Sequence, residues 1–349
     1  MMRAVVQRTT GTPEVLTLEE VDKPRPRSHQ VLVRIAACGV CFHDVVVRNG
    51  TMKAGVEMPL IPGHEICGVV EEVGDEVTLV KPGDRVATTQ RYHVCGACRF
   101  CRGGLEPLCA QRRFLGDHGM VGGYAEYVAI DHDNVVRVPD GVGDEQAAIA
   151  ACAIGTALNA VRDVGRVTLN DRVLVTGAGG GVGVHAVQLA RRAGAYVIAQ
   201  TTSADKAGLL ESLGAHVALL SARGEDFSKR VKALTDGEGV DVVIDCVGTV
   251  AFDAMRRSLG VNGRWILVGQ LTGDFVPFNP AQLFLRNQSM LSVHSTTRQQ
   301  LKDVLDLVAR GDVKPVIDGV HPLDDIRDVH ARVERGGVTG RMVVRPGVA

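Results

Sequence analysis

The sequence is poor in aromatic side chains, which make up 4% of its 349 residues and include a single tryptophan. It also lacks an excess of either charge, with 39 Lys and Arg against 40 Asp and Glu, so neither a basic nucleic-acid footprint nor a polyacidic tail is present. No apolar run approaches the roughly 20 residues that span a bilayer. We therefore expect no nucleic-acid and no membrane partner, and a core packed mainly from Val, Ile, Ala and Leu.

The first residues, Met1 to Gln7, have the pattern of a short strand rather than of a signal peptide. Nine cysteines without an export signal indicate a reducing compartment in which thiols serve metals. We therefore expect a cytoplasmic protein. The length suggests two domains of ordinary size, each with its own core.

Four cysteines, Cys95, Cys98, Cys101 and Cys109, are spaced C-x2-C-x2-C-x7-C inside a stretch rich in Gly and Arg. Four thiolates at this density can surround one tetrahedral Zn2+ and leave no coordination position open, as structural zinc sites do. The alternatives are a redox pair, a disulfide ladder or an iron–sulfur centre, whose motifs usually end in Cys-Pro or use other spacings. The spacing favours a structural zinc ion.

The hydrophobic period changes along the chain. Alternating runs such as 31–36 and 122–130 indicate an all-β, barrel-like first part. Beyond it, short apolar runs alternate with helical segments, as in a parallel sheet with helices on both faces. The pattern predicts an α/β plus β protein whose doubly wound parallel sheet has six strands, at 172–176, 196–200, 217–220, 241–245, 264–268 and 290–294. We expect domains at 1–153, completed by 297–349, and at 154–296.

A glycine-rich turn follows the first strand of the predicted parallel sheet and precedes a helix. Such a turn lets the backbone approach a pyrophosphate, which then lies at the helix N-terminus. Glycines also form ordinary turns, but the strand before, the helix after and the further βα units favour a dinucleotide site here. The candidate residues are Gly177, Gly179, Gly180, Gly181, Val182 and Gly183.

The end of the second strand indicates which dinucleotide binds. An NAD enzyme usually carries Asp or Glu there for the ribose hydroxyls, whereas this chain has Thr201, Thr202 and Ser203. Small hydroxyls leave room for a 2′-phosphate, which Lys206 or Arg223 could neutralise. The alternative is NAD, with Asp205 or water at the ribose. We favour NADP(H).

Cys41, His64 and Cys152 lie in separated segments. Two thiolates and an imidazole match a catalytic zinc site that keeps its fourth position for water or substrate. Any one of them alone is more often an ordinary buried residue. The residues around each of them therefore decide whether the three form a metal site.

These contexts resemble the zinc-containing medium-chain alcohol dehydrogenase/reductase family over the whole chain. The resemblance rests on Cys38-Gly-Val-Cys41-x-x-Asp44, Gly63-His64-Glu65, the four-cysteine loop, Cys152-Ala-Ile-Gly-Thr156 and the glycine turn, in the family's order. It implies a GroES-like catalytic domain and a Rossmann cofactor domain. It also implies an oxidoreductase with two zinc ions per subunit, one catalytic and one structural, in which zinc polarises an alcohol or carbonyl oxygen and hydride passes to or from nicotinamide.

The resemblance assigns roles to individual residues. Cys41, His64 and Cys152 bind the catalytic zinc, Glu65 approaches it when substrate is absent, and Asp44 orients the His64 ring. Further residues expected against the dinucleotide are Thr156, Val247, Val268, Gly269 and Val293.

The chain departs from the family pattern around the proton relay. His43 stands where relatives place Ser or Thr, and either takes the proton itself or packs on the cofactor ribose. Val46 replaces a further relay histidine. Phe42 replaces a cationic residue near the pyrophosphate, which leaves more of that binding to the glycine-turn amides.

Two enzyme activities fit the sequence. We favour interconversion of alcohols with aldehydes or ketones. The alternative is NADPH-dependent reduction of an enone or a 2-enoyl-CoA, because the glycine turn, 247–249 and 295–298 resemble a zinc-containing branch that reduces acryloyl-CoA-like thioesters. Arginines of the cysteine-rich loop could then meet CoA phosphates, namely Arg91, Arg99, Arg102, Arg112 and Arg113.

A zinc-stabilised binding protein without catalysis is a third possibility. The presence of all three catalytic ligands speaks against it. By resemblance, the 290–294 strand pairs with its copy in a homodimer, and two dimers form a tetramer in many relatives.

Overall fold

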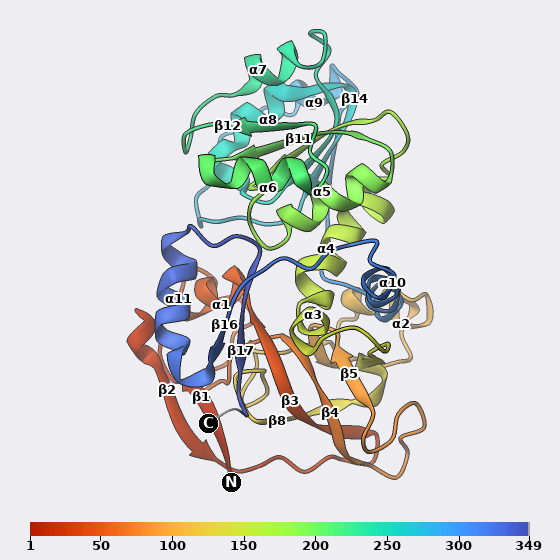
Figure 1. Ribbon diagram of the computed structural model, residues 1–349, viewed down its shortest axis with the longest axis vertical. Coiled ribbons are helices and arrows are strands. Elements are labelled where there is room, and N and C mark those ends of the chain that lie inside the picture. Colours follow the sequence, from red (N-terminus) through yellow and green to blue (C-terminus); the bar gives the residue numbers. More distant parts are fainter. Residues whose placement is uncertain (348–349) are drawn as a thin grey trace. The chain divides into compact units, whose positions relative to one another are not determined.

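The protein divides into two compact units in its computed structural model, which describes residues 1–347 (Figure 1). The first unit contains Met1–Gly155 and the C-terminal segment from Ser295 onward. The second contains Thr156–His294. The expected first domain ends at 349, and residues 348 and 349 lie outside the described part of the chain.

A seven-stranded sheet organises the first unit. Its order is β16–β17–β3–β4–β5–β9, and β8 also pairs with β3. The strands are β3 (Gln30–Val40), β4 (Glu65–Val73), β5 (Arg85–Thr88), β8 (Tyr127–Asp131), β9 (Val135–Arg137), β16 (Ile317–Pro322) and β17 (Arg341–Arg345). Alternate residues of β3 pack into a core with Ile66, Val70 and Val344, which confirms the predicted β-rich part.

The long strand β3 positions the candidate site because two strands flank its C-terminal end. Gly39 pairs with Glu65 of β4, and Val40 pairs with Met342 of β17. The chain then turns at Cys41 into a short helix. Residues from three distant parts of the sequence therefore meet where β3 ends.

The other elements of this unit surround the sheet. Strands β1 and β2 form a separate antiparallel pair, and β6 pairs with β7 beside the four-cysteine loop. Their bounds, with those of the helices, are β1 (Met2–Gln7), β2 (Leu16–Val21), β6 (Arg91–His93), β7 (Arg113–Phe114), α1 (Phe42–Arg48), α2 (Arg99–Arg102), α3 (Asp144–Ala148), α10 (Arg298–Ala309) and α11 (Ile326–Arg335).

The second unit is built on a parallel sheet with the order β12–β11–β10–β13–β14–β15, which confirms the predicted doubly wound fold. The central strands of this sheet are continuous apolar runs, because helices cover both faces of the sheet. Figure 1 shows α5 and α6 on one of these faces. The elements are α4 (Gly155–Leu158), which begins on the last residue of the first unit, β10 (Arg172–Thr176), α5 (Gly183–Arg192), β11 (Tyr196–Thr201), α6 (Ala207–Ser212), β12 (Val217–Leu220), α7 (Ser228–Ala233), β13 (Val240–Asp245), α8 (Phe252–Ser258), β14 (Leu259–Leu267), α9 (Ala281–Phe284) and β15 (Ser289–Ser292).

Strand β14 begins five residues before the predicted start at 264, at Leu259. Gly260, Asn262 and Gly263 interrupt the apolar pattern, and Asn262 has a φ of 59°. The pairing with β13 shifts register here, so the strand continues through an irregular stretch that the sequence pattern does not indicate.

Within residues 1–347, every helix is too short or too polar to cross a membrane.

Candidate functional site

Cys41, His64, Glu65 and Cys152 form a fully buried cluster in the first unit. Cys41 precedes α1, His64 directly precedes β4, Glu65 is the first residue of β4, and Cys152 lies in the π-helical segment Ala150–Ile154. Their ligand atoms all lie within 4.8 Å of one another, and the two sulfurs are 3.9 Å apart. Two thiolates on one tetrahedral zinc, with bonds of about 2.3 Å, lie roughly 3.8 Å apart. The donor set therefore fits zinc.

Asp44 joins two of these residues. One carboxylate oxygen, Oδ2, accepts the Cys41 backbone N–H at 2.9 Å and thereby caps α1. The other, Oδ1, lies 3.0 Å from Nδ1 of His64. Burial opposes ionisation of Asp44, but the charge and hydrogen bond of His64 outweigh it and hold the pKa of Asp44 well below its usual value. The ionised carboxylate holds Nδ1–H, which leaves Nε2 of His64 as the ligand atom.

Tyr124 and His330 extend this network away from the metal ligands. The Tyr124 hydroxyl donates to Oδ2 of Asp44 at 3.0 Å and lies 3.1 Å from Nε2 of His330. All three side chains are buried. Burial lowers the pKa of His330 to about 4, so this imidazole is neutral at physiological pH. Because the single Tyr124 proton is donated to Asp44, Nε2–H of His330 donates to the Tyr124 oxygen.

Glu65 forms a buried ion pair with Arg341 from β17. The Nη2 atom of Arg341 lies 2.8 Å from Oε1 of Glu65 and 3.7 Å from the Cys152 sulfur. Burial raises the pKa of Glu65 to about 7, and the guanidinium opposes that shift. A Cβ on Gly39 would lie 2.1 Å from Oε2 of Glu65, so glycine is required at this position of β3.

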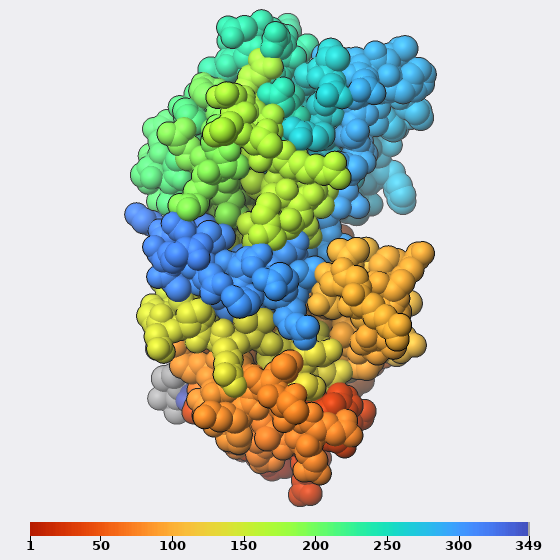
Figure 2. Space-filling view, turned by 90° about the vertical axis from the view of Figure 1, so that its right-hand side faces the viewer, coloured from red at the N-terminus to blue at the C-terminus, as the bar shows by residue number. Residues whose placement is uncertain are grey.

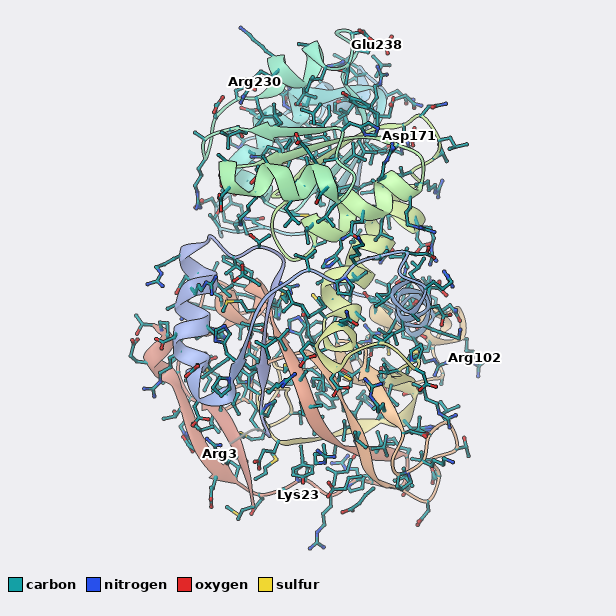
Figure 3. All side chains as sticks on the ribbon, in the orientation of Figure 1. Arg3, Lys23, Arg102, Asp171, Arg230 and Glu238 are labelled. Atoms are coloured by element: carbon teal, nitrogen blue, oxygen red, sulfur yellow. The ribbon has the colours of Figure 1, made fainter. Side chains whose placement is uncertain are left out.

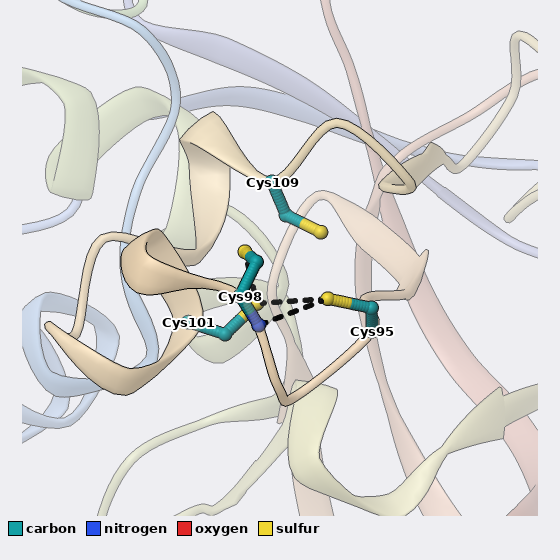
Figure 4. A group of neighbouring side chains, drawn as sticks. All are labelled: Cys95, Cys98, Cys101 and Cys109. Carbon is teal, nitrogen blue, oxygen red and sulfur yellow. Dashed lines mark hydrogen bonds between the residues drawn. The ribbon is translucent and has the colours of Figure 1, made fainter.

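The four cysteines of the 95–109 loop come together in the same unit, as Figure 4 shows. The sulfur of Cys101 lies 3.9 Å from that of Cys95 and 3.6 Å from that of Cys98. These distances also match the sulfur separation of about 3.8 Å on tetrahedral zinc. The loop forms a projecting, yellow-orange lobe in Figure 2. None of the nine cysteines, all of which lie in the described part of the chain, forms a disulfide, so the disulfide alternative is wrong.

The glycine turn of the second unit connects β10 to α5. Gly177 has a φ of +59°, which favours glycine, and a Cβ on Gly183 would lie 2.4 Å from the Gly177 carbonyl oxygen. The turn therefore packs closely against the start of α5. Its backbone N–H groups and the positive end of the helix dipole suit an anionic phosphate.

Lys206 lies over this turn. Its Cδ would be 2.5 Å from a Cβ on Gly179, and the side chain is buried. Thr201, at the end of β11, accepts the Ser203 N–H at 3.2 Å, whereas Thr202 is exposed. Both Asp205 and Arg223 are exposed. A cation and small hydroxyls thus flank the glycine turn.

Two family descriptions match the chain. Residues 27–140 match the alcohol dehydrogenase GroES-like domain, and residues 181–310 match the zinc-binding dehydrogenase family. An alcohol dehydrogenase of Geobacillus stearothermophilus is 36% identical over 99% of both chains. An acryloyl-coenzyme A reductase of Sulfurisphaera tokodaii is 32% identical over 99% of this chain and 100% of the relative. The crystal structure of AibC is 40% identical, with a TM-score of 0.91, and covers 99% of this chain and 96% of that chain.

The chain belongs to the zinc-containing medium-chain alcohol dehydrogenase/reductase family. It is an oxidoreductase that uses zinc and a nicotinamide cofactor.

The remaining predicted cofactor residues of this dehydrogenase lie in the second unit. Thr156 is buried in α4, and the Val247 side chain packs over Gly177. Val268 and Gly269 directly follow β14 and donate N–H groups to the Asp245 carbonyl, while Val293 follows β15. Apart from Thr156, these residues lie at the carboxyl ends of parallel strands, the edge at which such sheets bind ligands.

His43 lies beside the metal cluster and pairs with Asp117. Its Nε2 is 2.8 Å from Oδ1 of Asp117, and its ring centroid is 5.2 Å from that of His64. Burial opposes protonation of His43, but the hydrogen bond and the charge of Asp117 outweigh it, so its pKa is raised. Asp117 is itself buried.

The arginines of the cysteine-rich loop differ in exposure. Arg91 is buried and donates to the Ser295 hydroxyl and the Thr296 carbonyl, both at 2.8 Å, so the expectation that it meets CoA phosphates is wrong. Arg112 is half-buried and donates to the Cys109 carbonyl. The exposed arginines of the set are Arg99, Arg102, which points outward in Figure 3, and Arg113.

Sequence reasoning missed four residues of the site: Arg341, Asp117, Tyr124 and His330. The position of Arg341 could have indicated a functional role, because a charged residue in an otherwise apolar strand is unusual. The structure shows that Arg341 is buried. Asp117 and Tyr124 stand in glycine-rich segments without a comparable signal.

Proposed function

We propose that this dehydrogenase interconverts an alcohol with an aldehyde or ketone, with Cys41, His64 and Cys152 holding a catalytic zinc. One observation carries the proposal: a buried three-ligand set of zinc dimensions has an imidazole, His43, directly beside it. Zinc in such a site supplies Lewis acidity toward an alcohol or carbonyl oxygen, and the nicotinamide cofactor supplies or accepts hydride.

The surrounding residues have positioning roles. Asp44 holds His64 in one tautomer and one orientation, and Tyr124 holds Asp44. Arg341 keeps Glu65 beside the ligands as half of a buried ion pair, so that Glu65 is the carboxylate that approaches the metal when substrate is absent. Removal of either partner would leave the other charge buried and unpaired.

His43 is proposed as the proton acceptor and donor of the reaction. Asp117 fixes the ring through Nε2 and favours the protonated form that arises when the imidazole accepts a proton. Relatives have a hydroxyl side chain at this position. In this chain the His43 imidazole can accept and donate the proton itself, without a hydroxyl group.

We expect D117N to lower kcat about 10- to 100-fold, because it removes the charge that stabilises protonated His43 but leaves the zinc ligands in place. General acid–base catalysis contributes about 10²- to 10⁴-fold, so partial loss through a positioning residue is smaller. Steady-state kinetics and zinc content test this. H118Q, a change at the adjacent histidine, should keep wild-type kcat. An unchanged kcat in D117N would contradict the proposed role of His43 as proton acceptor and donor.

The two units have separate proposed tasks. The first is the catalytic domain, expected at 1–153 with 297–349, and holds both cysteine clusters; the second is the cofactor domain, expected at 154–296. The observed units divide at 155/156 and 294/295. We further propose that the 95–109 loop binds a structural zinc, which gives one catalytic and one structural ion per subunit in the two cysteine clusters.

We propose NADP(H) as the preferred dinucleotide. The support is the buried Lys206 over Gly179, together with the small hydroxyls at the end of β11. Thr201, Thr202 and Ser203 leave room for a 2′-phosphate, and Lys206 supplies a charge that can reach it.

K206M is therefore expected to raise KM for NADPH by about 10- to 100-fold with little change for NADH. A hydrogen bond to a charged group contributes about 1.5–3 kcal/mol, and 1.4 kcal/mol is tenfold in affinity. Initial-rate kinetics with both cofactors measure the ratio. K229M, a change at an exposed lysine of the same unit, is the matched control. Equal losses with both cofactors would indicate a pyrophosphate contact instead.

Reduction of a 2-enoyl-CoA or an enone is the second candidate. Relatives named acryloyl-coenzyme A reductase favour it, and the exposed Arg99, Arg102 and Arg113 remain available to CoA phosphates.

A paired rate assay with NADPH separates the two functions. One set of reactions contains aldehydes and ketones, and the other acryloyl-CoA or crotonyl-CoA; loss of reduced nicotinamide is followed in both. Oxidation with carbonyl compounds only supports the proposal. Oxidation with enoyl thioesters only overturns it in favour of the second candidate. If neither reacts, repeating the panel with NADH tests the cofactor preference.

A homodimer that joins two copies of β15 is the proposed assembly. β15 is the edge strand of the parallel sheet, and its Leu291 is exposed. Sedimentation equilibrium distinguishes the dimer from a tetramer of two such pairs, and M290P, which removes a donor from the edge strand, should yield monomers.

A further inference from the structure

A third group of metal-type ligands lies away from both cysteine clusters. It consists of His29, His93 and Asp131, whose ligand atoms lie within 4.8 Å of one another. Nε2 of His29 is 3.1 Å from Oδ1 of Asp131, and Nδ1 of His93 is 2.6 Å from Oδ2. Ligand atoms of a tetrahedral zinc with bonds of about 2.0–2.2 Å lie roughly 3.3–3.6 Å apart. Small movements of the two rings would therefore admit an ion.

The backbone holds these residues together before any ion binds. Gln30 and Asp131 are opposite each other in the β3–β8 pairing, and the His132 N–H donates to the His29 carbonyl at 3.0 Å. Gln30 also donates from its side chain to Oδ1 of Asp131 at 3.1 Å. His93 ends β6, which packs against β8. The three ligands thus come from the turn before β3 and from the ends of β6 and β8.

The burial pattern suits a metal ion with water ligands. The Asp131 side chain is 6% exposed, whereas those of His29 and His93 are 44% and 37% exposed. Both imidazoles turn toward one buried carboxylate although each is accessible to solvent. An ion at their meeting point would keep positions open to water, and Gln30 would orient the carboxylate as an outer-shell partner.

We propose that His29, His93 and Asp131 bind a divalent transition-metal ion, with zinc as the representative. Two imidazoles and one carboxylate suit Zn2+, Co2+ or Ni2+ better than Mg2+ or Ca2+, which prefer oxygen ligands. His93 precedes Cys95 by two positions. The ion links the residues that precede the four-cysteine loop to the end of β8 and the start of β3. It contributes to the stability of the folded protein rather than to turnover.

The test compares wild-type holoenzyme with H29N, which removes one ligand and leaves the four-cysteine loop unchanged. Each protein is incubated with excess ZnCl2, passed through a desalting column, and analysed for zinc by mass spectrometry. Wild type should retain one more ion per chain than H29N. A Zn2+ titration against a competing chelating dye should show at least about 10-fold weaker binding to H29N.

The matched control is H321N, because His321 also faces a carboxylate, with Nδ1 4.0 Å from Oδ2 of Asp325, but belongs to none of the metal-type groups found within residues 1–347. H321N should bind zinc like wild type, and H29C, which restores a ligand, should recover the additional ion. Unaltered turnover verifies that H29N is folded. Equal zinc content and affinity in wild type and H29N, or equal losses in H29N and H321N, would overturn the proposal and leave a hydrogen-bonded His–Asp–His group.

Discussion

C41S is expected to lower kcat/KM by at least about a thousandfold while the enzyme remains folded. The Cys41 sulfur lies 3.9 Å from that of Cys152 in the buried cluster, and a serine hydroxyl is a much poorer zinc ligand than a thiolate. Lewis-acid stabilisation is worth several kcal/mol, and about 4 kcal/mol corresponds to a thousandfold in rate. Steady-state kinetics, zinc analysis and thermal melting are measured on the same preparation.

C67S is the matched control for this experiment. Cys67 is a fully buried cysteine of β4, two positions after Glu65, but lies outside the metal-type clusters of the described chain. Its sulfur contacts Asp144 at 3.7 Å. C67S should retain turnover and zinc. Near-normal turnover in C41S would exclude Cys41 as a catalytic ligand.

C98S is expected to lower the melting temperature by about 10 °C or more. Structural zinc contributes about 10–16 kcal/mol in small zinc-binding peptides, so loss of about 4 kcal/mol is a modest fraction. For domains of about 150–250 residues, each kcal/mol shifts Tm by about 2–4 °C. The loop between Cys95 and Cys109 contains only one helical turn and a 3₁₀ turn, so little else holds it together. Calorimetry with and without a chelator provides the measurement.

The neighbouring Ala97 offers the control for C98S. A97S introduces the same hydroxyl one position away in the same loop, where the side chain is exposed. It should melt like wild type. If C98S bound one zinc ion fewer yet melted at the wild-type temperature, the loop would bind zinc but the thermal stability of the protein would not depend on that ion.

Local spacing explains what could be predicted from the sequence. The C-x2-C-x2-C-x7-C run, the His64-Glu65 pair and the glycine turn each place their residues within a single segment, so their geometry follows from the chain's own bonds. The alternating βα pattern likewise predicted the parallel sheet, because a strand buried on both faces is continuously apolar.

Long-range pairing explains what could not be predicted. Arg341 reaches Glu65 only because β17 and β4 both flank β3. Asp117 meets His43 across 74 positions, and the spacing of neither residue indicates the other. Arg91 was expected to be available to CoA phosphates, yet its hydrogen bonds with the segment that begins the C-terminal part of the first unit keep it buried.

The pairing of β3 with β17 also governs when the enzyme can mature during synthesis. Cys41, His64 and Cys152 all leave the ribosome long before Arg341. Until then, one edge of β3 has no partner from β17, and Glu65 is without its guanidinium. Domains generally fold as units as the chain emerges, but this one must wait for its final strand. A nascent chain stalled before β17 therefore carries every proposed catalytic zinc ligand together with an unpaired strand edge, which is a template for aggregation.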